Sequence, residues 1–177
     1  MKQKNYFNDA RRSRWLPTLV MLLAMFAGGV SPAWAKATIL SEGFESSNLG
    51  SWTLVDANSS TKVETTGKRT GSYGFTFNYN TNPPQYLISP QISIPSNAAD
   101  IVLSFYYKAR NSSYPESFKV GYSTTDNETG SFTWDDEVTN ITSTSFVEYT
   151  NSSFSIPVAA KYIAIAYTAN NMYSLYH

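Results

Sequence analysis

Apolar and polar side chains alternate along several short stretches of the chain. In Ile101–Lys108 the odd-numbered residues are Ile, Leu, Phe and Tyr, so they would share one face of an extended segment. Phe118–Tyr122 and Tyr162–Tyr167 repeat the alternation. Because a period of two is typical of half-buried strands, these three stretches are predicted to be strands.

Shorter runs add further strand candidates, and clusters of Gly, Pro and Asn separate them. No long stretch repeats its apolar residues at the three-to-four spacing of an amphipathic helix. This pattern predicts an all-β chain folded as a β-sandwich of the jelly-roll type. The weaker strand candidates are Thr38–Leu40, Trp52–Val55, Thr61–Glu64, Tyr73–Tyr79, Gln85–Ile94, Phe146–Tyr149, Ser153–Ile156 and Met172–Tyr176.

The last candidate strand runs into the end of the sequence at Tyr176 and His177. A final strand with nothing after it would leave backbone groups unpaired at the margin of a sheet. We therefore expect either a true edge strand or a domain that is truncated at its C-terminus.

The first 35 residues have the three parts of a secretory signal peptide. A basic start is followed by the uncharged, apolar stretch Leu16–Val30, and Ala33 and Ala35 supply the small residues before a cleavage site. The apolar stretch is shorter than the roughly 20 residues that a membrane-spanning helix needs. We therefore predict a signal peptide over 1–35, a single domain over 36–177 without a membrane span, and a secreted or cell-surface location.

Charge and cysteine content narrow the possible partners of residues 36–177. This part of the chain has eight basic and twelve acidic side chains, and the whole sequence has no cysteine. Nucleic-acid-binding proteins present a basic face, so nucleic acid is not expected as a partner. Thiol chemistry and thiolate metal sites are excluded as well.

The shortage of histidine argues against catalysis. The one histidine is the terminal residue, His177, so neither a Ser-His-Asp nor a Cys-His arrangement can form inside the domain. A pair of carboxylates, as in glycoside hydrolysis, remains possible, and the densest acidic run is Asp135–Glu137 beside Trp134. We interpret this run as a solvated turn and expect no enzyme.

Aromatic residues are more numerous than a core of this size requires, with 13 Tyr, 10 Phe and 4 Trp in the sequence. Tyr and Trp are enriched at recognition surfaces because they bury large areas and keep a polar group. Tyr106 and Tyr107 would lie on opposite faces of one strand, so one of them should point outward. Tyr114 and Trp134, both expected in loops, are the candidates for ligand contact.

Several motifs in order resemble the cleaved-adhesin domains of gingipains and hemagglutinins, which are related to the jelly-roll domains of cell-surface anchor proteins. The resemblance covers nearly all of Ile39–Tyr176 and is carried by Gly43–Ser46, Trp52–Asp56, Tyr86–Ile92, Leu103–Ala109, Tyr114–Val120, Tyr122–Thr125, Tyr162–Tyr167 and Met172–Leu175. It implies a secreted or surface-held jelly-roll domain that binds host proteins, glycans or haem-containing proteins and often carries structural calcium.

Calcium binds through several hard oxygen ligands, and Glu45 and Asp56 are the candidate carboxylates. We expect Glu45 to end one strand and Asp56 the next, so that both could meet at one rim of the sandwich. The alternative is that Glu45 is only an exposed side chain at the edge of a sheet and binds no ion. Family members commonly have an Asp-Gly-Asp loop after the early Trp strand, whereas here Asp56 is followed by Ala57–Ser60.

Three functions remain open from the sequence. The leading hypothesis is a non-catalytic adhesin-like module that recognises a host protein or glycan. The others are a carbohydrate-binding accessory domain of a secreted hydrolase, and a structural spacer in a larger surface protein.

Overall fold

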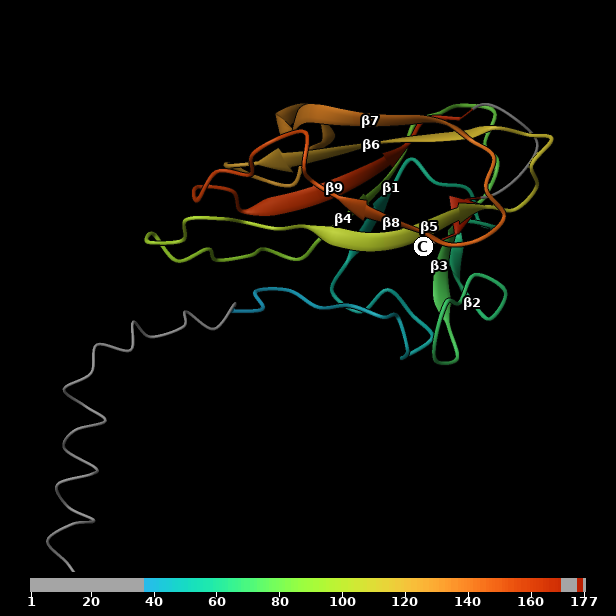
Figure 1. The fold of residues 1–177 in the computed structure, drawn as a ribbon, viewed down its shortest axis with the longest axis horizontal. Coiled ribbons are helices and arrows are strands. Elements are labelled where there is room, and N and C mark those ends of the chain that lie inside the picture. Colours follow the sequence, from blue (N-terminus) through green and yellow to red (C-terminus); the bar gives the residue numbers. More distant parts are fainter. Residues whose placement is uncertain (1–36, 170–174, 177) are drawn as a thin grey trace, which may run out of the picture. The chain divides into compact units, whose positions relative to one another are not determined.

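The computed structural model describes residues 37–169 and 175–176 of the chain. Figure 1 shows strands joined by long loops, and almost all of the regular secondary structure in the described residues is strand. These strands are β1 (Thr53–Val55), β2 (Lys62–Glu64), β3 (Gly74–Phe77), β4 (Gln85–Ile88), β5 (Ser104–Ala109), β6 (Glu116–Ser123), β7 (Thr133–Ile141), β8 (Val147–Thr150), β9 (Tyr162–Tyr167) and β10 (Leu175–Tyr176), with a 3₁₀ turn, η1, at Thr129–Ser131.

The strands form two five-stranded sheets with antiparallel pairing between neighbours. The first sheet has the order β1-β4-β9-β6-β7, and the second has the order β2-β3-β10-β5-β8. Figure 1 shows β6, β7 and β9 in one layer and β5 with β3 in the other. Both sheets mix strands from the early and late parts of the chain, as a jelly roll requires.

The core lies between the sheets and is largely aromatic. Phe75 and Phe77 of β3 face Phe118 of β6 and Tyr167 of β9, and all four side chains are fully buried. The rings of Phe77 and Tyr167 stack with centroids 5.4 Å apart. Burial of such rings is the main stabilising contribution, since each removes a large apolar area from water.

The three clearest predicted strands are confirmed as β5, β6 and β9, and the predicted alternation of faces holds. Phe105 and Tyr107 pack against the core, so Tyr106 between them lies on the outer face. The predicted start of β5 at Ile101 is wrong, because the strand begins at Ser104. Asn151 instead holds the preceding segment: it accepts a hydrogen bond from the Leu103 amide and donates one to the Ile101 carbonyl.

Two weaker strand predictions are wrong, and a third is too long. Residues 38–40 and 153–156 form no strand, and β4 ends at Ile88 rather than at Ile94. Ile92 and Ile94 instead pack under a small cluster around Ile163 at one end of the sandwich. The Ile92 amide still donates a hydrogen bond of 2.8 Å to the Lys161 carbonyl, but these residues form no regular strand, and their alternation reflects a segment with one buried side.

The longest strand, β7, was not predicted. We interpreted Asp135–Glu137 as a solvated turn, but these residues lie in the middle of β7 and pair with β6. Adjacent acids favour turns, yet β7 is an edge strand, and edge strands commonly carry charges on their solvent-exposed positions. Asp135 and Glu137 are exposed in this way.

The end of the described chain also differs from expectation. Leu175 and Tyr176 form β10, which pairs with β3 on one side and β5 on the other, so it is a central strand, and of the two alternatives the edge strand is wrong. The predicted signal peptide over 1–35 and most of the candidate strand from Met172 lie outside the described residues. Within the described residues no helix is long and apolar enough to span a membrane.

Candidate functional site

The outer face of the first sheet carries a patch of aromatic and small residues. The register places Tyr86 of β4, Ala166 of β9 and Lys119 of β6 in one row across the sheet. The next row contains Ile88, Ala164, Gly121 and Trp134 in the same strand order, extended to β7. Two alanines and a glycine at the centre leave a low floor between the bulky side chains of β4 and β7.

A β-bulge brings Trp134 onto this face. Val120 pairs with Asp136 and points into the core, whereas the next residue, Gly121, pairs with Trp134. The extra residue in β7 reverses the orientation of the side chains that precede it. Without the bulge, Trp134 would have the same orientation as Asp136 and would point between the sheets.

Gly121 gives Trp134 the room to lie across the sheet. A Cβ atom at position 121 would be 2.7 Å from Cε3 of the Trp134 ring and 2.6 Å from the carbonyl oxygen of Thr133. Real side chains do not tolerate such distances, and the Thr133 oxygen belongs to the backbone. Glycine at this position is therefore required for the tryptophan to cover β6.

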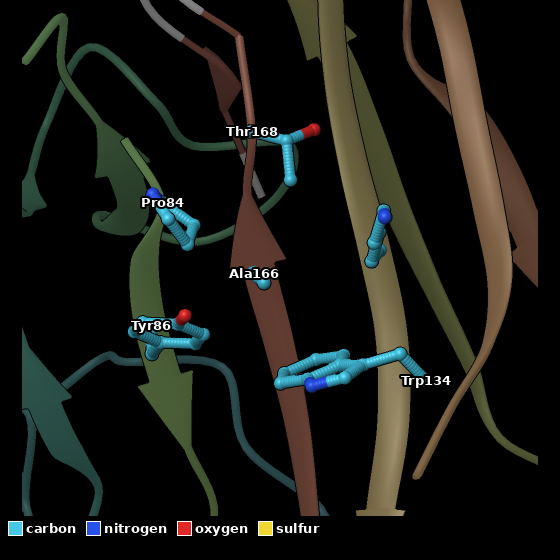
Figure 2. A pocket seen from close by; sticks show the side chains of 6 residues that line it. Pro84, Tyr86, Trp134, Ala166 and Thr168 are labelled. Carbon is cyan, nitrogen blue, oxygen red and sulfur yellow. The ribbon is translucent and has the colours of Figure 1, made fainter. Parts of the chain in front are cut away.

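A shallow pocket of about 270 Å³ lies beside Trp134. Its floor is Ala166, and its sides come from four strands or their ends: Pro84, Tyr86, Lys119, Trp134 and Thr168. Figure 2 shows the rings of Tyr86 and Trp134 reaching toward each other across the strand that carries Ala166, with Pro84 and Thr168 farther along the same face.

The two rings form a continuous apolar surface. The centroids of Tyr86 and Trp134 are 5.7 Å apart with planes tilted by 40°. A sugar ring held between two aromatic faces needs about 7–8 Å, twice the usual contact distance between carbon atoms. Nothing the size of a sugar fits between these rings, so a ligand would pack against the surface that they make together.

One face of Trp134 is already covered. Phe132 stacks on it with centroids 5.4 Å apart and planes inclined by 30°. Ile88 and Ala164 beneath the rings are fully buried. These contacts fix the tryptophan in place and leave its opposite face to line the pocket.

The charges around the pocket are mostly negative. The Lys119 ammonium lies 3.7 Å from a carboxylate oxygen of Glu137, and both side chains are about half exposed. Partial burial, and to a smaller extent the negative charge of Asp56, raise the pKa of the Tyr86 hydroxyl. Tyr86 therefore stays protonated and can donate a hydrogen bond at any physiological pH.

The family model of the cleaved adhesin domain matches residues 37–169. This range contains every strand except β10 and every residue that lines the pocket. The chain belongs to the cleaved adhesin family. No curated protein sequence matches the chain at a significant level.

Solved structures with the same fold include further cleaved adhesin domains. One domain of Lys-gingipain from Porphyromonas gingivalis has a TM-score of 0.64 and 22% sequence identity, and the match covers 78% of this chain and 94% of that one. A second domain of the same protein has a TM-score of 0.61 and 22% identity, with 79% of this chain and 94% of that one covered.

Carbohydrate-binding modules share the fold at lower identity. TmCBM61, solved with β-1,4-galactotriose, has a TM-score of 0.55 and 13% identity, covering 79% of this chain and 94% of that one. The C-terminal family 22 module of Clostridium thermocellum Xyn10B has a TM-score of 0.52 and 16% identity. The match covers 78% of this chain and 88% of that one. This cleaved adhesin domain is thus an adhesin-type module with a fold that carbohydrate-binding modules also use.

The acidic run beside the pocket is divided between two faces of the sheet. Asp136 points toward the second sheet and accepts a hydrogen bond of 2.8 Å from the Tyr149 hydroxyl. Glu137 pairs with Lys119 on the outer face. Because glycoside hydrolysis needs two carboxyl groups on either side of one bond, Asp136 and Glu137 cannot act as such a pair.

The two predicted contact residues lie apart. Trp134 lines the pocket, although it belongs to β7 and the expected loop position is wrong. Tyr114 lies in the turn before β6, is half-buried and does not line the pocket. A ligand contact at Tyr114 stays a prediction.

The two predicted calcium ligands have different partners in the structure. Glu45 lies in a turn rather than at a strand end, and its carboxylate accepts a hydrogen bond of 2.8 Å from the Ser72 amide. Asp56 follows β1 as expected, and its carbonyl accepts one from the Asn80 side chain. Within 37–169 and 175–176, no three acidic or histidine side chains gather as a metal site. Calcium at these residues stays a prediction.

The sequence interpretation missed most of the pocket. Tyr86 was one of many tyrosines, and Lys119, Ala166 and Thr168 carried no signal of their own. Alternation alone places Ala164 and Ala166 on one face of β9, which could have indicated a low floor. The bulge that turns Trp134 outward has no such signature.

Proposed function

We propose that this chain is a non-catalytic, secreted or surface-held adhesin module that binds a neutral glycan in the pocket between Tyr86, Trp134 and Thr168. The observation that carries the proposal is the uncovered face of Trp134 above a floor of Ala166. Sugars present C–H groups on one face and hydroxyls around the rim, so they pack against aromatic rings and hydrogen-bond to the polar groups beside them.

The polar groups of the pocket complement this apolar surface. The Tyr86 and Thr168 hydroxyls can each donate or accept a hydrogen bond, and the Lys119 ammonium can donate up to three. Thr168 is held by a hydrogen bond of 2.8 Å to the Ser117 hydroxyl, which fixes its side chain before a ligand arrives. Preorganised groups cost less entropy on binding.

A neutral ligand fits the charges better than an acidic one. An acidic sugar would gain the Lys119 ammonium at the expense of its contact with Glu137, and it would also approach Asp56 beside Tyr86. Exposed ion pairs are worth about 0–1 kcal/mol, so the gain from Lys119 alone is small. We therefore expect galactose, xylose or glucose units rather than uronic or sialic acids.

A glycan array tests the proposal directly. The array should contain β-1,4-galactotriose, xylohexaose, cello-oligosaccharides, uronic acid oligomers and sialylated glycans, together with a panel of extracellular matrix proteins. We expect retention on at least one neutral series and none on the acidic ones. Retention on acidic glycans alone, or on a protein free of glycans, would contradict the proposal. No retention at all would favour a structural spacer.

Variants locate the binding. Trp134→Ala removes the stacking surface, so we expect the affinity for the neutral glycan, measured by isothermal titration calorimetry, to fall at least about tenfold, which is about 1.4 kcal/mol. Tyr106→Ala is the matched control, because Tyr106 lies on the outer face of the other sheet and should leave binding unchanged. Equal loss in both variants would contradict the assignment of the pocket.

A further inference from the structure

The pocket is closed along one side by a wall that is two layers thick. Tyr86 and Trp134 form the layer that faces the pocket (Figure 2). Behind Trp134 lies Phe132, which is 8% exposed, and below it Ala164, which is fully buried. A sugar on that side of Trp134 would overlap the Phe132 ring.

The direction of the wall follows from the register. Trp134 belongs to the row of Ile88, Ala164 and Gly121, and its ring crosses β6 toward β4. Tyr86 starts one row away on β4 and meets it from the opposite side. The wall therefore runs across the strands, and a ligand that follows the strand direction must stop at it.

Side chains also border the floor of the pocket on the two sides next to the wall. Tyr86 borders Ala166 on the β4 side and Lys119 on the β6 side, and Pro84 lies farther along the β4 side (Figure 2). Pro84 is rigid, whereas Lys119 is held at 3.7 Å from Glu137. A sugar on Ala166 thus has an aromatic wall before it and a side chain on each flank.

We propose, on the basis of the glycan-binding function above, that the pocket recognises the end of a glycan chain and not an internal stretch. The terminal sugar packs against the free face of Trp134, and the rest of the chain leaves toward Thr168 and solvent. An internal sugar has a neighbour at both ends, and the neighbour on the wall side would occupy the volume of Tyr86, Trp134 and Phe132. The partner is therefore a glycan with exposed ends, such as a branched surface glycan.

The stoichiometry of binding to chains of increasing length tests this inference. The probes are β-1,4-galactan and β-1,4-xylan oligosaccharides of three, six and twelve sugars, titrated into the unmodified protein by calorimetry. End recognition predicts one protein molecule per chain at every length and a Kd that changes less than about twofold from three to twelve sugars. An internal site predicts more protein bound per chain as the chain grows.

The outcomes separate the two proposals. A protein-to-chain ratio that rises between six and twelve sugars overturns chain-end recognition and leaves glycan binding intact. No heat of binding with either series counts against the proposed function itself. Trp134→Ala should weaken binding of the three- and twelve-sugar probes by the same factor, because both probes contact the tryptophan through one terminal sugar.

Discussion

At the scale of single residues, Glu116 is the strongest departure from an apolar core. Its side chain is fully buried at the start of β6, where Oε2 accepts a hydrogen bond of 2.6 Å from the Tyr167 hydroxyl. Its other oxygen, Oε1, has no hydrogen-bond partner. Burial raises the pKa of Glu116 to about 7, and the hydrogen bond from Tyr167 opposes this rise only in part.

This pKa makes the stability of the domain depend on pH. The pKa of Glu116 rises from 4.5 in the unfolded chain to about 7 in the fold, so the folded state binds the proton more tightly. The resulting contribution to stability is fully present below pH 4.5. This stability is lost as the pH rises toward 7, because the unfolded chain releases the proton at lower pH than the folded chain does. We expect the free energy of unfolding in urea to fall by about 2–3 kcal/mol between pH 5 and pH 8.

Glu116→Gln provides the comparison. The amide keeps an acceptor for Tyr167 and cannot ionise, so its unfolding free energy should be nearly level over the same range. Glu128→Gln, an exposed acid next to η1, should retain the pH dependence of the unmodified protein. If the unfolding free energy of the unmodified protein did not change with pH, ionisation of Glu116 would not destabilise the fold, and the prediction would be wrong.

At the scale of elements, the pairing of β6 with β7 determines the site. The register shifts between Val120 and Gly121, and this one irregularity places Asp136 in the sandwich and Trp134 on its surface. Trp134, Gly121 and Lys119 therefore belong to one local arrangement of two strands, and disturbance of the bulge should affect the pocket before it affects the core.

Gly121→Ala tests this arrangement. The added methyl group would be 2.6 Å from the Thr133 carbonyl oxygen, so β7 or the Trp134 ring must move. We expect a loss of about 1–3 kcal/mol in unfolding free energy, typical of overpacking, together with a loss of glycan affinity. Tryptophan fluorescence should change with it, because the environment of Trp134 changes.

Gly130→Ala is the matched control, since a Cβ atom at Gly130 would contact nothing within 4 Å. It lies in η1, close to β7 in sequence, and should leave both stability and binding as they are. Similar effects in the two variants would mean that Gly121 is not needed for the position of Trp134.

At the scale of the whole molecule, the sandwich separates stability from recognition. The aromatic core between the sheets is closed to solvent, whereas the pocket uses the outer face of one sheet. Glu45 also has a structural partner, because its carboxylate binds the Ser72 amide next to Gly71. A bound ion would add to this contact at the loop before β3.

Thermal unfolding with and without calcium tests the metal prediction made from the sequence. We expect calcium to raise the Tm and EDTA to lower it, since a ligand that binds the folded state alone stabilises it by mass action. Glu45→Gln should remove this response, whereas Asp135→Asn, on the exposed edge of β7, should keep it. An identical Tm in calcium and in EDTA would rule out an ion at Glu45 and Asp56.

The period-two alternation determined much of this fold. Strand identity at Phe118–Tyr122 and Tyr162–Tyr167, and the opposite faces of Tyr106 and Tyr107, follow from the sequence because each strand buries one side of itself. Family membership could also be inferred, since its motifs are local and occur in order. Edge strands such as β7 escape this signal, because their charged positions resemble those of turns.

Only the tertiary structure decided where the site lies. Tyr86, Ala166, Lys119 and Trp134 come from four strands, and their proximity depends on the order β4-β9-β6-β7. Sheet order and register result from packing over the whole domain, and no short stretch of sequence encodes them. The bulge before Gly121 is the clearest case: it changes no residue type, yet it determines on which side of the sheet the tryptophan lies.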